Sequence, residues 1–223
     1  MLLKELLFPS RCLVCRRISK DVICNECLSK VSLIKSPICE ICGSPIENDG
    51  ICYKCKVSPP YFSKARSYAL YEGVMRTAII RFKFEKRKSL GLFLGEMLGK
   101  FASRLAWNVD FIVPIPLSKE RLKSRGFNQS EILALEVSKI LRVPISLSLI
   151  RIKETKPSIN LNVEERLNNI NRAFLLSDNS LKGKRVLLVD DVYTTGATIN
   201  EAGKTLLERD IKEVRAITLA REL

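Results

Sequence analysis

Residues 186–198 constrain the fold of this chain more than any other stretch. Their first four residues, Val186 to Val189, are apolar with a β-branched residue at each end, which is typical of a buried strand in a parallel sheet. Asp190 and Asp191 follow directly, so we expect the strand to stop there. The two carboxylates are then predicted to lie at the carboxyl end of a strand in an α/β fold.

The loop after these acids has the composition of a phosphate-binding loop. Thr198 with Glu201 three residues later forms a capping-box pattern that predicts a helix start. Backbone N–H groups in a tight loop, together with the positive end of a helix dipole, hold a phosphate. The residues assigned to this cradle are Thr194, Thr195, Gly196, Ala197 and Thr198. Carboxylates accept but do not donate hydrogen bonds, so Asp190 and Asp191 suit the neighbours of that phosphate, which are hydroxyls or a hydrated Mg²⁺.

All eight cysteines lie near the start of the chain, in four Cys-x-x-Cys pairs. Tetrahedral zinc takes two such pairs per ion, so the pattern predicts two structural Zn²⁺ sites. A redox pair of the thioredoxin type would instead need one pair in a βαβ setting. The predicted ligands are Cys12, Cys15, Cys24, Cys27, Cys39, Cys42, Cys52 and Cys55.

Short internal loops favour sequential pairing of these cysteines, with residues 12–27 and 39–55 forming successive ribbons around a short helix over 25–34. Cross-braced pairing remains an alternative at this stage. Ribbons of this kind bind nucleic acid, bind protein, or replace a core that is too small to form. The sequence does not choose among these roles.

The composition points to a protein of the cytoplasm without membrane insertion. The chain has 223 residues, 46% of them hydrophobic, and no apolar run approaches the roughly 18 residues that span a bilayer. Residues 1–8 are too short and too interrupted by Glu5 for a signal peptide, so we expect an amphipathic helix that ends at Pro9.

The net charge of +14 is concentrated in residues 61–109, which carry 10 basic and 3 acidic residues. A helix predicted over 74–84 has a basic side that is either a solvated face or a surface for single-stranded nucleic acid. The residues of that surface are Arg76, Arg81, Lys83, Lys86, Arg87 and Lys88.

Other elements follow from apolar periodicity. A helix is expected over 90–105, with Leu92, Phe93, Met97 and Phe101 as core residues. Strands are expected over 65–71, 111–113, 143–150, 173–176 and 214–219, and a long polar loop followed by a short helix fills 153–169.

A second anion site is predicted after the strand at 111–113. A proline-stiffened turn leads there into clustered cations, and Asn128 with Glu131 caps the next helix. These cations either bind an anion or are ordinary surface charges near a turn. The residues assigned are Pro116, Leu117, Ser118, Lys119, Arg121 and Arg125.

Residues 186–198 resemble the phosphoribosyl-pyrophosphate (PRPP) signature of type I phosphoribosyltransferases. The ordered combination of four Cys-x-x-Cys pairs, residues 71–76, 113–117 and 125–129, and this signature resembles the ComF family over essentially the whole chain. Family members commonly have His where this chain has Ser118, and Gln where it has Ser158.

The resemblance implies a double zinc ribbon over 1–60 and a type I phosphoribosyltransferase domain over 61–223, with hood elements at 61–107 and the core at 108–223. That core is a parallel Rossmann-like sheet with flanking helices. The resemblance also implies that the Thr-rich loop takes the 5-phosphate of PRPP and that the two acids hold the ribose hydroxyls. Residues 116–125 would hold the pyrophosphate, and Mg²⁺ would then bridge it to the ribose hydroxyls.

Two functions fit this resemblance. The first is transfer or sensing of the phosphoribosyl group, linked to DNA uptake and competence, with Asp190 and Asp191 as the catalytic acids. The second is a non-catalytic factor that handles single-stranded DNA and uses PRPP as a regulatory ligand. Implied partners are single-stranded DNA and other competence proteins such as a helicase. The chain contains no His, so no His can act as general base.

Overall fold

The computed structural model describes residues 9–85, 87–153 and 172–223. Three expectations fall outside these ranges: the amphipathic helix over 1–8, the place of Lys86, and most of the loop and short helix over 153–169.

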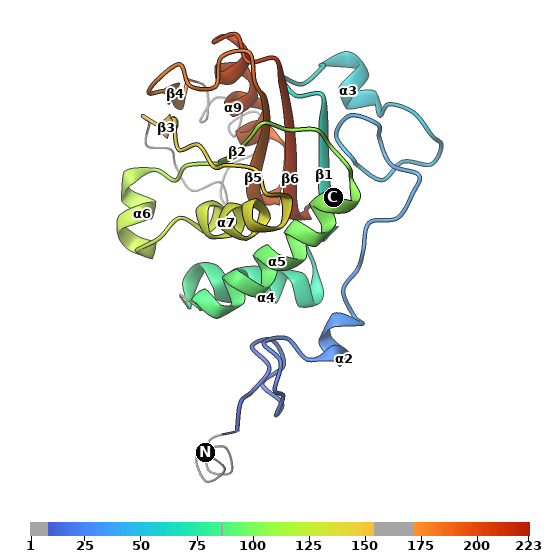
Figure 1. The fold of residues 1–223 in the computed structure, drawn as a ribbon. Helices are drawn as coiled ribbons and strands as arrows, with labels where there is room; N and C mark the ends of the chain where they lie inside the picture. The colour runs from blue at the N-terminus through green and yellow to red at the C-terminus, as the bar shows by residue number, and fades with distance from the viewer. Residues whose placement is uncertain (1–8, 86, 154–171) are drawn as a thin grey trace.

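The described elements alternate between strands and helices in the way an α/β fold requires (Figure 1). The helices are α2 (Asn25–Leu28), α3 (Tyr53–Val57), α4 (Gly73–Phe84), α5 (Lys88–Arg104), α6 (Lys119–Arg125), α7 (Gln129–Leu141) and α9 (Ala197–Leu207). The strands are β1 (Lys64–Leu70), β2 (Phe111–Pro114), β3 (Leu149–Arg151), β4 (Phe174–Leu176), β5 (Arg185–Tyr193) and β6 (Glu213–Arg221).

Four strands form one parallel sheet in the order β1-β6-β5-β2, which confirms the predicted fold class. Strand β5 is one of the two inner strands, and its residues Val186 to Val189 are fully buried because helices cover both faces of the sheet. Strands β3 and β4 form a separate antiparallel pair. The carboxyl ends of β2 and β5 are neighbours, so the two predicted anion loops leave the sheet side by side.

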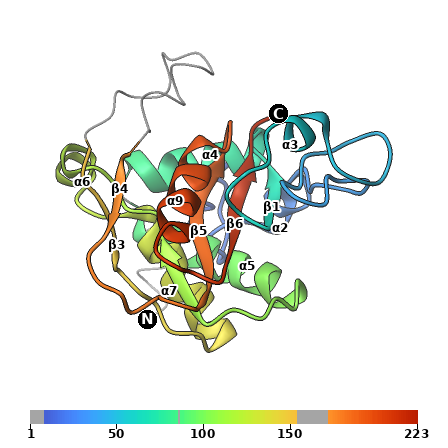
Figure 2. The same cartoon turned by 90° about the horizontal axis from the view of Figure 1, so that it is seen from above.

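Alternating residues of β5 serve two different cores. Val186 and Leu188 face the core that includes α9, whereas Leu187 and Val189 face the core built with α4, α5 and α7. Figures 1 and 2 show α9 on one side of the sheet and the other three helices on the opposite side. The sheet is therefore the middle layer of a three-layer domain.

Strand β5 does not stop at the acids, contrary to the expectation. It continues to Tyr193, and residues 190–193 still pair with β6. The acids are tolerated inside the strand because Asp190 accepts hydrogen bonds from Ser130 and from the N–H of Asp191, while Asp191 pairs with Lys83.

The predicted face of α5 was wrong in part. Leu92 is 49% exposed, and the face that packs inward is built from Leu90, Leu94 and Leu98 together with glycines. Phe93, Met97 and Phe101 are only partly buried at its side. Gly95 and Gly99 let α5 approach α7 closely, since a Cβ on Gly99 would lie 2.6 Å from the Ile140 side chain.

Candidate functional site

The loop between β5 and α9 has the geometry of an anion cradle. Gly196 has φ of +81°, and a Cβ at this position would collide with the Tyr193 hydroxyl. Helix α9 begins at Ala197, whose N–H is 3.4 Å from Thr195 Oγ1. The first turn of this helix therefore follows a tight glycine turn and is flanked by small residues, which is the backbone arrangement of an anion site.

The predicted capping box at this helix is wrong. The residue before the helix is Gly196, with no side-chain cap, so Thr198 lies within the first turn. Glu201 accepts a hydrogen bond from the backbone N–H of Arg172 instead. Because Gly196 has no side chain to cap the helix, the N–H groups of this turn other than that of Ala197 are left for an external acceptor.

The acid pair is held by groups from two other helices. Ser130 of α7 donates to Asp190 Oδ1 over 2.9 Å, and Lys83 Nζ of α4 lies 2.7 Å from Asp191 Oδ1. Burial and the neighbouring charge of Asp191 raise the pKa of Asp190 to about 7. The pair therefore offers one carboxylate that is already neutralised by Lys83 and one that binds a proton near neutral pH.

The segment after β2 lies beside these acids. Ser118 precedes α6 and is buried, and its Oγ has no hydrogen-bond partner among the described residues. Lys119 is exposed, while Arg121 and Arg125 are partly buried. Pro116 and Leu117 form the turn that leads into α6, so the predicted pyrophosphate loop is a short turn followed by a helix.

Arg125 of this segment is held by two side-chain contacts. Its Nη1 donates to Gln129 Oε1 over 2.7 Å, and its guanidinium lies 5.3 Å from the centroid of the Phe84 ring. The pKa of Arg125 is lowered by burial, although the charges of Asp191 and Asp190 oppose this shift. The Nε2 of buried Gln129 lacks a partner among the described residues, so a donor and a cation are both available beside the acids.

The predicted helix cap at Asn128 is confirmed. Its side-chain oxygen accepts from the N–H of Ser130, and its amide donates to Ile115 O and Glu131 Oε1. These bonds fix the turn after β2 relative to α7. They therefore also fix Ser130, the donor to Asp190.

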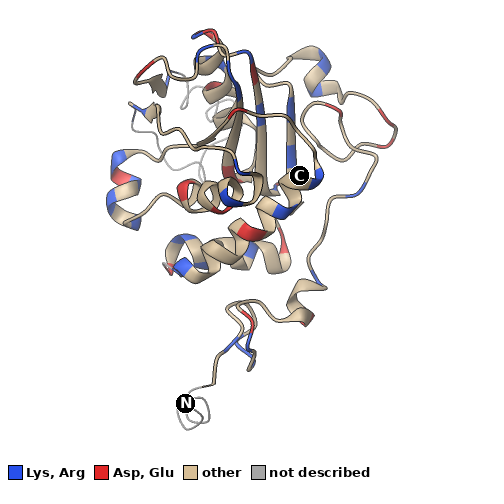
Figure 3. Ribbon diagram, viewed as in Figure 1, with Lys and Arg blue, Asp and Glu red and all other residues tan. Residues whose placement is uncertain are grey.

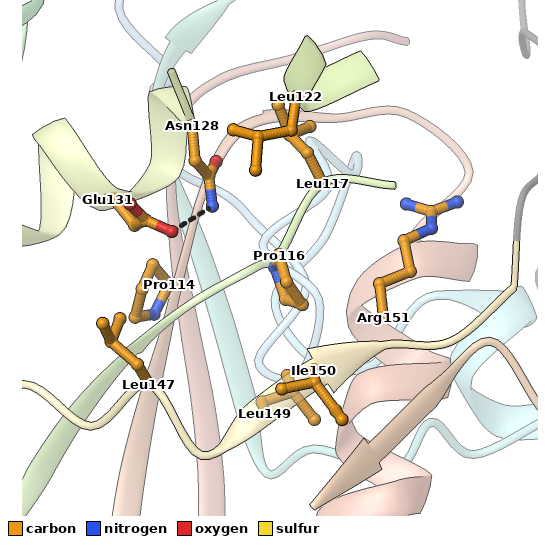
Figure 4. Close-up of a pocket in the computed structure, with 10 residues that line it drawn as sticks. All are labelled: Pro114, Pro116, Leu117, Leu122, Asn128, Glu131, Leu147, Leu149, Ile150 and Arg151. Atoms are coloured by element: carbon orange, nitrogen blue, oxygen red, sulfur yellow. Dashed lines mark hydrogen bonds between the residues drawn. The ribbon is translucent and has the colours of Figure 1, made fainter. Parts of the chain in front are cut away.

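A small pocket of about 210 Å³ adjoins this segment (Figure 4). Its walls are mainly apolar, and Asn128 and Glu131 add polar groups on one side. The lining residues are Pro114, Pro116, Leu117, Leu122, Asn128, Glu131, Leu147, Leu149, Ile150 and Arg151. Such a pocket suits a flat apolar group with an N–H donor.

The eight cysteines form two tetrads in sequential order. Cys12, Cys15, Cys24 and Cys27 form one, and Cys39, Cys42, Cys52 and Cys55 form the other. In each tetrad the Sγ atoms lie within 4.8 Å of one another. This grouping agrees with sequential pairing, and four converging thiols are the donor set of a structural zinc ribbon.

The basic residues assigned to a nucleic-acid surface do not form one group. Arg81 donates to Leu13 O and pairs with Glu85, and Lys83 points to Asp191. Arg76, Arg87 and Lys88 are exposed, and Lys86 lies outside the described residues. Figure 3 shows basic residues along α4 and α6, on the helices that flank the acid pair.

Two cations of the site were not predicted as such. Lys83 was assigned to the surface, and Lys54 was not assigned at all, although its Nζ lies 2.7 Å from Thr195 O in the phosphate loop. Both approach from segments far away in sequence. Local patterns carry no signal for such contacts, because only the fold brings the segments together.

No helix in the described ranges is both long and apolar enough to cross a membrane.

Comparison with known proteins identifies both parts of the chain. The double zinc ribbon domain family matches residues 3–56, and the phosphoribosyl transferase domain family matches residues 122–223. Competence protein ComFC of Bacillus subtilis is 33% identical over 90% of this chain and 85% of its own length. DNA utilization protein YhgH of Escherichia coli is 29% identical over 96% of this chain and 98% of its own length.

Among solved structures, the glutamine phosphoribosylpyrophosphate amidotransferase of B. subtilis matches with a TM-score of 0.40 and 22% identity. That match covers 57% of this chain and 25% of the other. The two relatives, by contrast, extend over both the cysteine ribbons and the sheet domain. The chain therefore belongs to the ComF family, and it joins a double zinc ribbon domain to a phosphoribosyl transferase domain.

Proposed function

We propose that this protein binds PRPP with Mg²⁺ at the carboxyl ends of β2 and β5, and that it does so in the uptake or utilisation of DNA. Its relatives are named as a competence protein and a DNA utilization protein, and these names support a role in the uptake or utilisation of DNA. One observation supports PRPP as the ligand: an uncapped loop, a pair of acids and a cationic turn lie together at one end of the sheet.

In this proposal the loop of residues 194–198 takes the 5-phosphate, and Asp190 and Asp191 accept hydrogen bonds from the ribose hydroxyls. The turn and helix at 116–125 receive the pyrophosphate, with Arg125 as its main cation. The partnerless Ser118 Oγ and Gln129 Nε2 support this assignment, because buried donors without partners are costly unless a ligand satisfies them. Lys83 then balances the charge of Asp191 and of the ligand.

The same residues support Mg²⁺ as the companion of PRPP. Mg²⁺ prefers oxygen ligands, keeps several waters and is usually shared between carboxylates and substrate phosphates. It would supply charge neutralisation at the pyrophosphate leaving group. The chain itself would position the ribose through the acids and stabilise the departing charge through Arg125 and Lys83.

Calorimetry of PRPP binding with and without Mg²⁺ tests the proposal on the full chain with both zinc ions. We expect binding that strengthens with Mg²⁺ and is lost in the Asp190→Asn/Asp191→Asn double variant. No PRPP binding by the parent, or unchanged binding in the double variant, would refute the site.

Whether the phosphoribosyl group is transferred or only sensed is a separate question. Transfer requires release of pyrophosphate that depends on PRPP, Mg²⁺ and an acceptor. The pocket in Figure 4 makes nucleobases the first acceptors to test, followed by ammonia and glutamine. Binding without pyrophosphate release across this panel supports a sensor.

A second role, contact with single-stranded DNA, is supported by one surface. Arg76, Arg87 and Lys88 are exposed on α4 and at the start of α5, and the nearby Phe84 ring is 63% exposed. Cations interleaved with an exposed aromatic ring suit phosphates and stacked bases.

A further inference from the structure

The second ribbon, residues 39–57, packs against the sheet end that carries the phosphate loop. Figures 1 and 2 both place α3 of this ribbon next to the edge strand β1. The N–H of Ala65 in β1 donates to Ile41 O over 2.7 Å, and Arg66 donates to Glu40 O over 3.0 Å. Three of its four cysteines are buried in the same core as Tyr193 and Ala197.

One direct contact joins this ribbon to the loop. Lys54 lies on α3 between Cys52 and Cys55, and its Nζ donates to Thr195 O over 2.7 Å. Its ammonium has three N–H donors, and the side chain is exposed. A phosphate seated on the loop would therefore lie within the reach of this cation.

A second, indirect contact runs through a buried arginine. Arg221 at the end of β6 is 4% exposed, and its Nη1 donates to Cys42 O over 2.7 Å. Its guanidinium lies 4.6 Å from the centroid of the Tyr193 ring. Tyr193 in turn fills the space beside Gly196, the glycine that shapes the loop. The cysteine ribbon, Arg221, Tyr193 and the loop thus form one packed series.

We infer that the second ribbon is part of the phosphate site: Lys54 binds the phosphate monoester of the ligand, and the zinc-held ribbon positions the loop through Arg221 and Tyr193. This inference rests on the proposed function. The four thiols of the ribbon fit a zinc ion, whose contribution here is to hold the ribbon fold. The first ribbon lies on the other side of the sheet, in the core with α4 and α5, and among the described residues no hydrogen bond joins it to the loop.

Lys54→Met tests the direct contact, and Lys56→Met is its matched control. Lys56 is exposed on the same helix, and its replacement by Met removes the same charge. Titration with ribose 5-phosphate isolates the phosphate monoester, and titration with PRPP adds the pyrophosphate. We expect Lys54→Met to weaken both ligands about tenfold or more and Lys56→Met to change them less than twofold.

These titrations separate the inference from the proposed function. If the parent binds neither ligand, the proposed function fails. If the parent binds both and the two lysine variants behave alike, the inference fails while the proposed function stands.

The indirect contact is tested by removing one zinc site at a time. Cys52→Ser and Cys24→Ser should each leave one zinc ion per chain by elemental analysis. We expect only Cys52→Ser to lose affinity for ribose 5-phosphate. Equal affinities of the two variants for ribose 5-phosphate, with circular dichroism showing that the sheet domain is still folded, would overturn the inference. If Cys52→Ser unfolds, the lysine pair decides.

Discussion

Lys83 and Asp191 are 108 positions apart in the sequence, yet Lys83 Nζ lies 2.7 Å from Asp191 Oδ1. Their side chains are only 16% and 11% exposed. A lysine on helix α4 is thereby tied to the acid pair of the sheet. Because both groups are shielded from water, their attraction is stronger than that of a surface ion pair.

Lys83→Met should weaken PRPP binding. The variant removes a cation that balances both Asp191 and the bound phosphates, and charged hydrogen bonds of this kind contribute about 1.5–3 kcal/mol. We expect a loss of roughly 10- to 100-fold in affinity by calorimetry, by the same principle. Lys88→Met removes an exposed lysine of the next helix and serves as the control. Equal affinities for the two variants would contradict a role of Lys83 in the site.

Asp190→Asn should stabilise the ligand-free protein against unfolding above neutral pH. The folded carboxyl has its pKa raised to about 7, so the native state binds a proton more strongly than the unfolded chain between about pH 4 and 7. Stability contributed by this group therefore falls as pH rises through that window. The amide is neutral and keeps an oxygen to accept from Ser130 and from the N–H of Asp191.

Denaturant unfolding at pH 4 and pH 8 checks this expectation. The variant should gain about 1–3 kcal/mol over the parent at pH 8 and much less at pH 4. An equal difference at both values would show that the effect is unrelated to ionisation. The same variant should lose Mg²⁺-dependent PRPP binding, because its side chain no longer carries a charge.

The parallel sheet and the tight loop after β5 were predictable because their signals are local. The apolar run, the two acids and the Thr-rich turn are contiguous in the sequence. The capping contact of Asn128 is equally local, because its side chain accepts from the N–H of Ser130, two residues later. Four Cys-x-x-Cys pairs likewise predicted two tetrads. The extent of β5 beyond the acids was not predictable, because partners on α4 and α7 are what allow acids inside a strand.

The missed features depend on tertiary packing. Helix α5 buries glycines rather than Leu92, because close approach to α7 decides which face turns inward. Lys83 carries the same local signature as its exposed neighbours Arg87 and Lys88. Only the pairing of α4 with the sheet distinguishes a site lysine from a surface lysine.

Gly196→Ala should disrupt the phosphate loop beyond the cost of its backbone conformation. The residue has positive φ, which costs a non-glycine residue roughly 1–2 kcal/mol, and the new methyl would also collide with Tyr193. Gly183→Ala is the matched control, since Gly183 has φ of +71° and no atom within 4 Å of the added Cβ.

Both variants should lower the free energy of unfolding, Gly196→Ala by more. Only Gly196→Ala should also lose affinity for ribose 5-phosphate in calorimetry. Similar effects of the two alanines on stability and on binding would mean that Tyr193 does not shape the loop.

Neutralising Arg76, Arg87 and Lys88 together should weaken single-stranded DNA binding without affecting PRPP. Each lost phosphate contact reduces the slope of log affinity against log salt by about 0.7, so three contacts reduce it by about 2. Fluorescence anisotropy at several salt concentrations measures this slope. The control neutralises Lys182, Lys184 and Lys212, three exposed lysines at the amino ends of β5 and β6. Because both triple variants lose the same charge, a reduced slope in the first alone assigns DNA to the α4–α5 surface, and equal slopes exclude it.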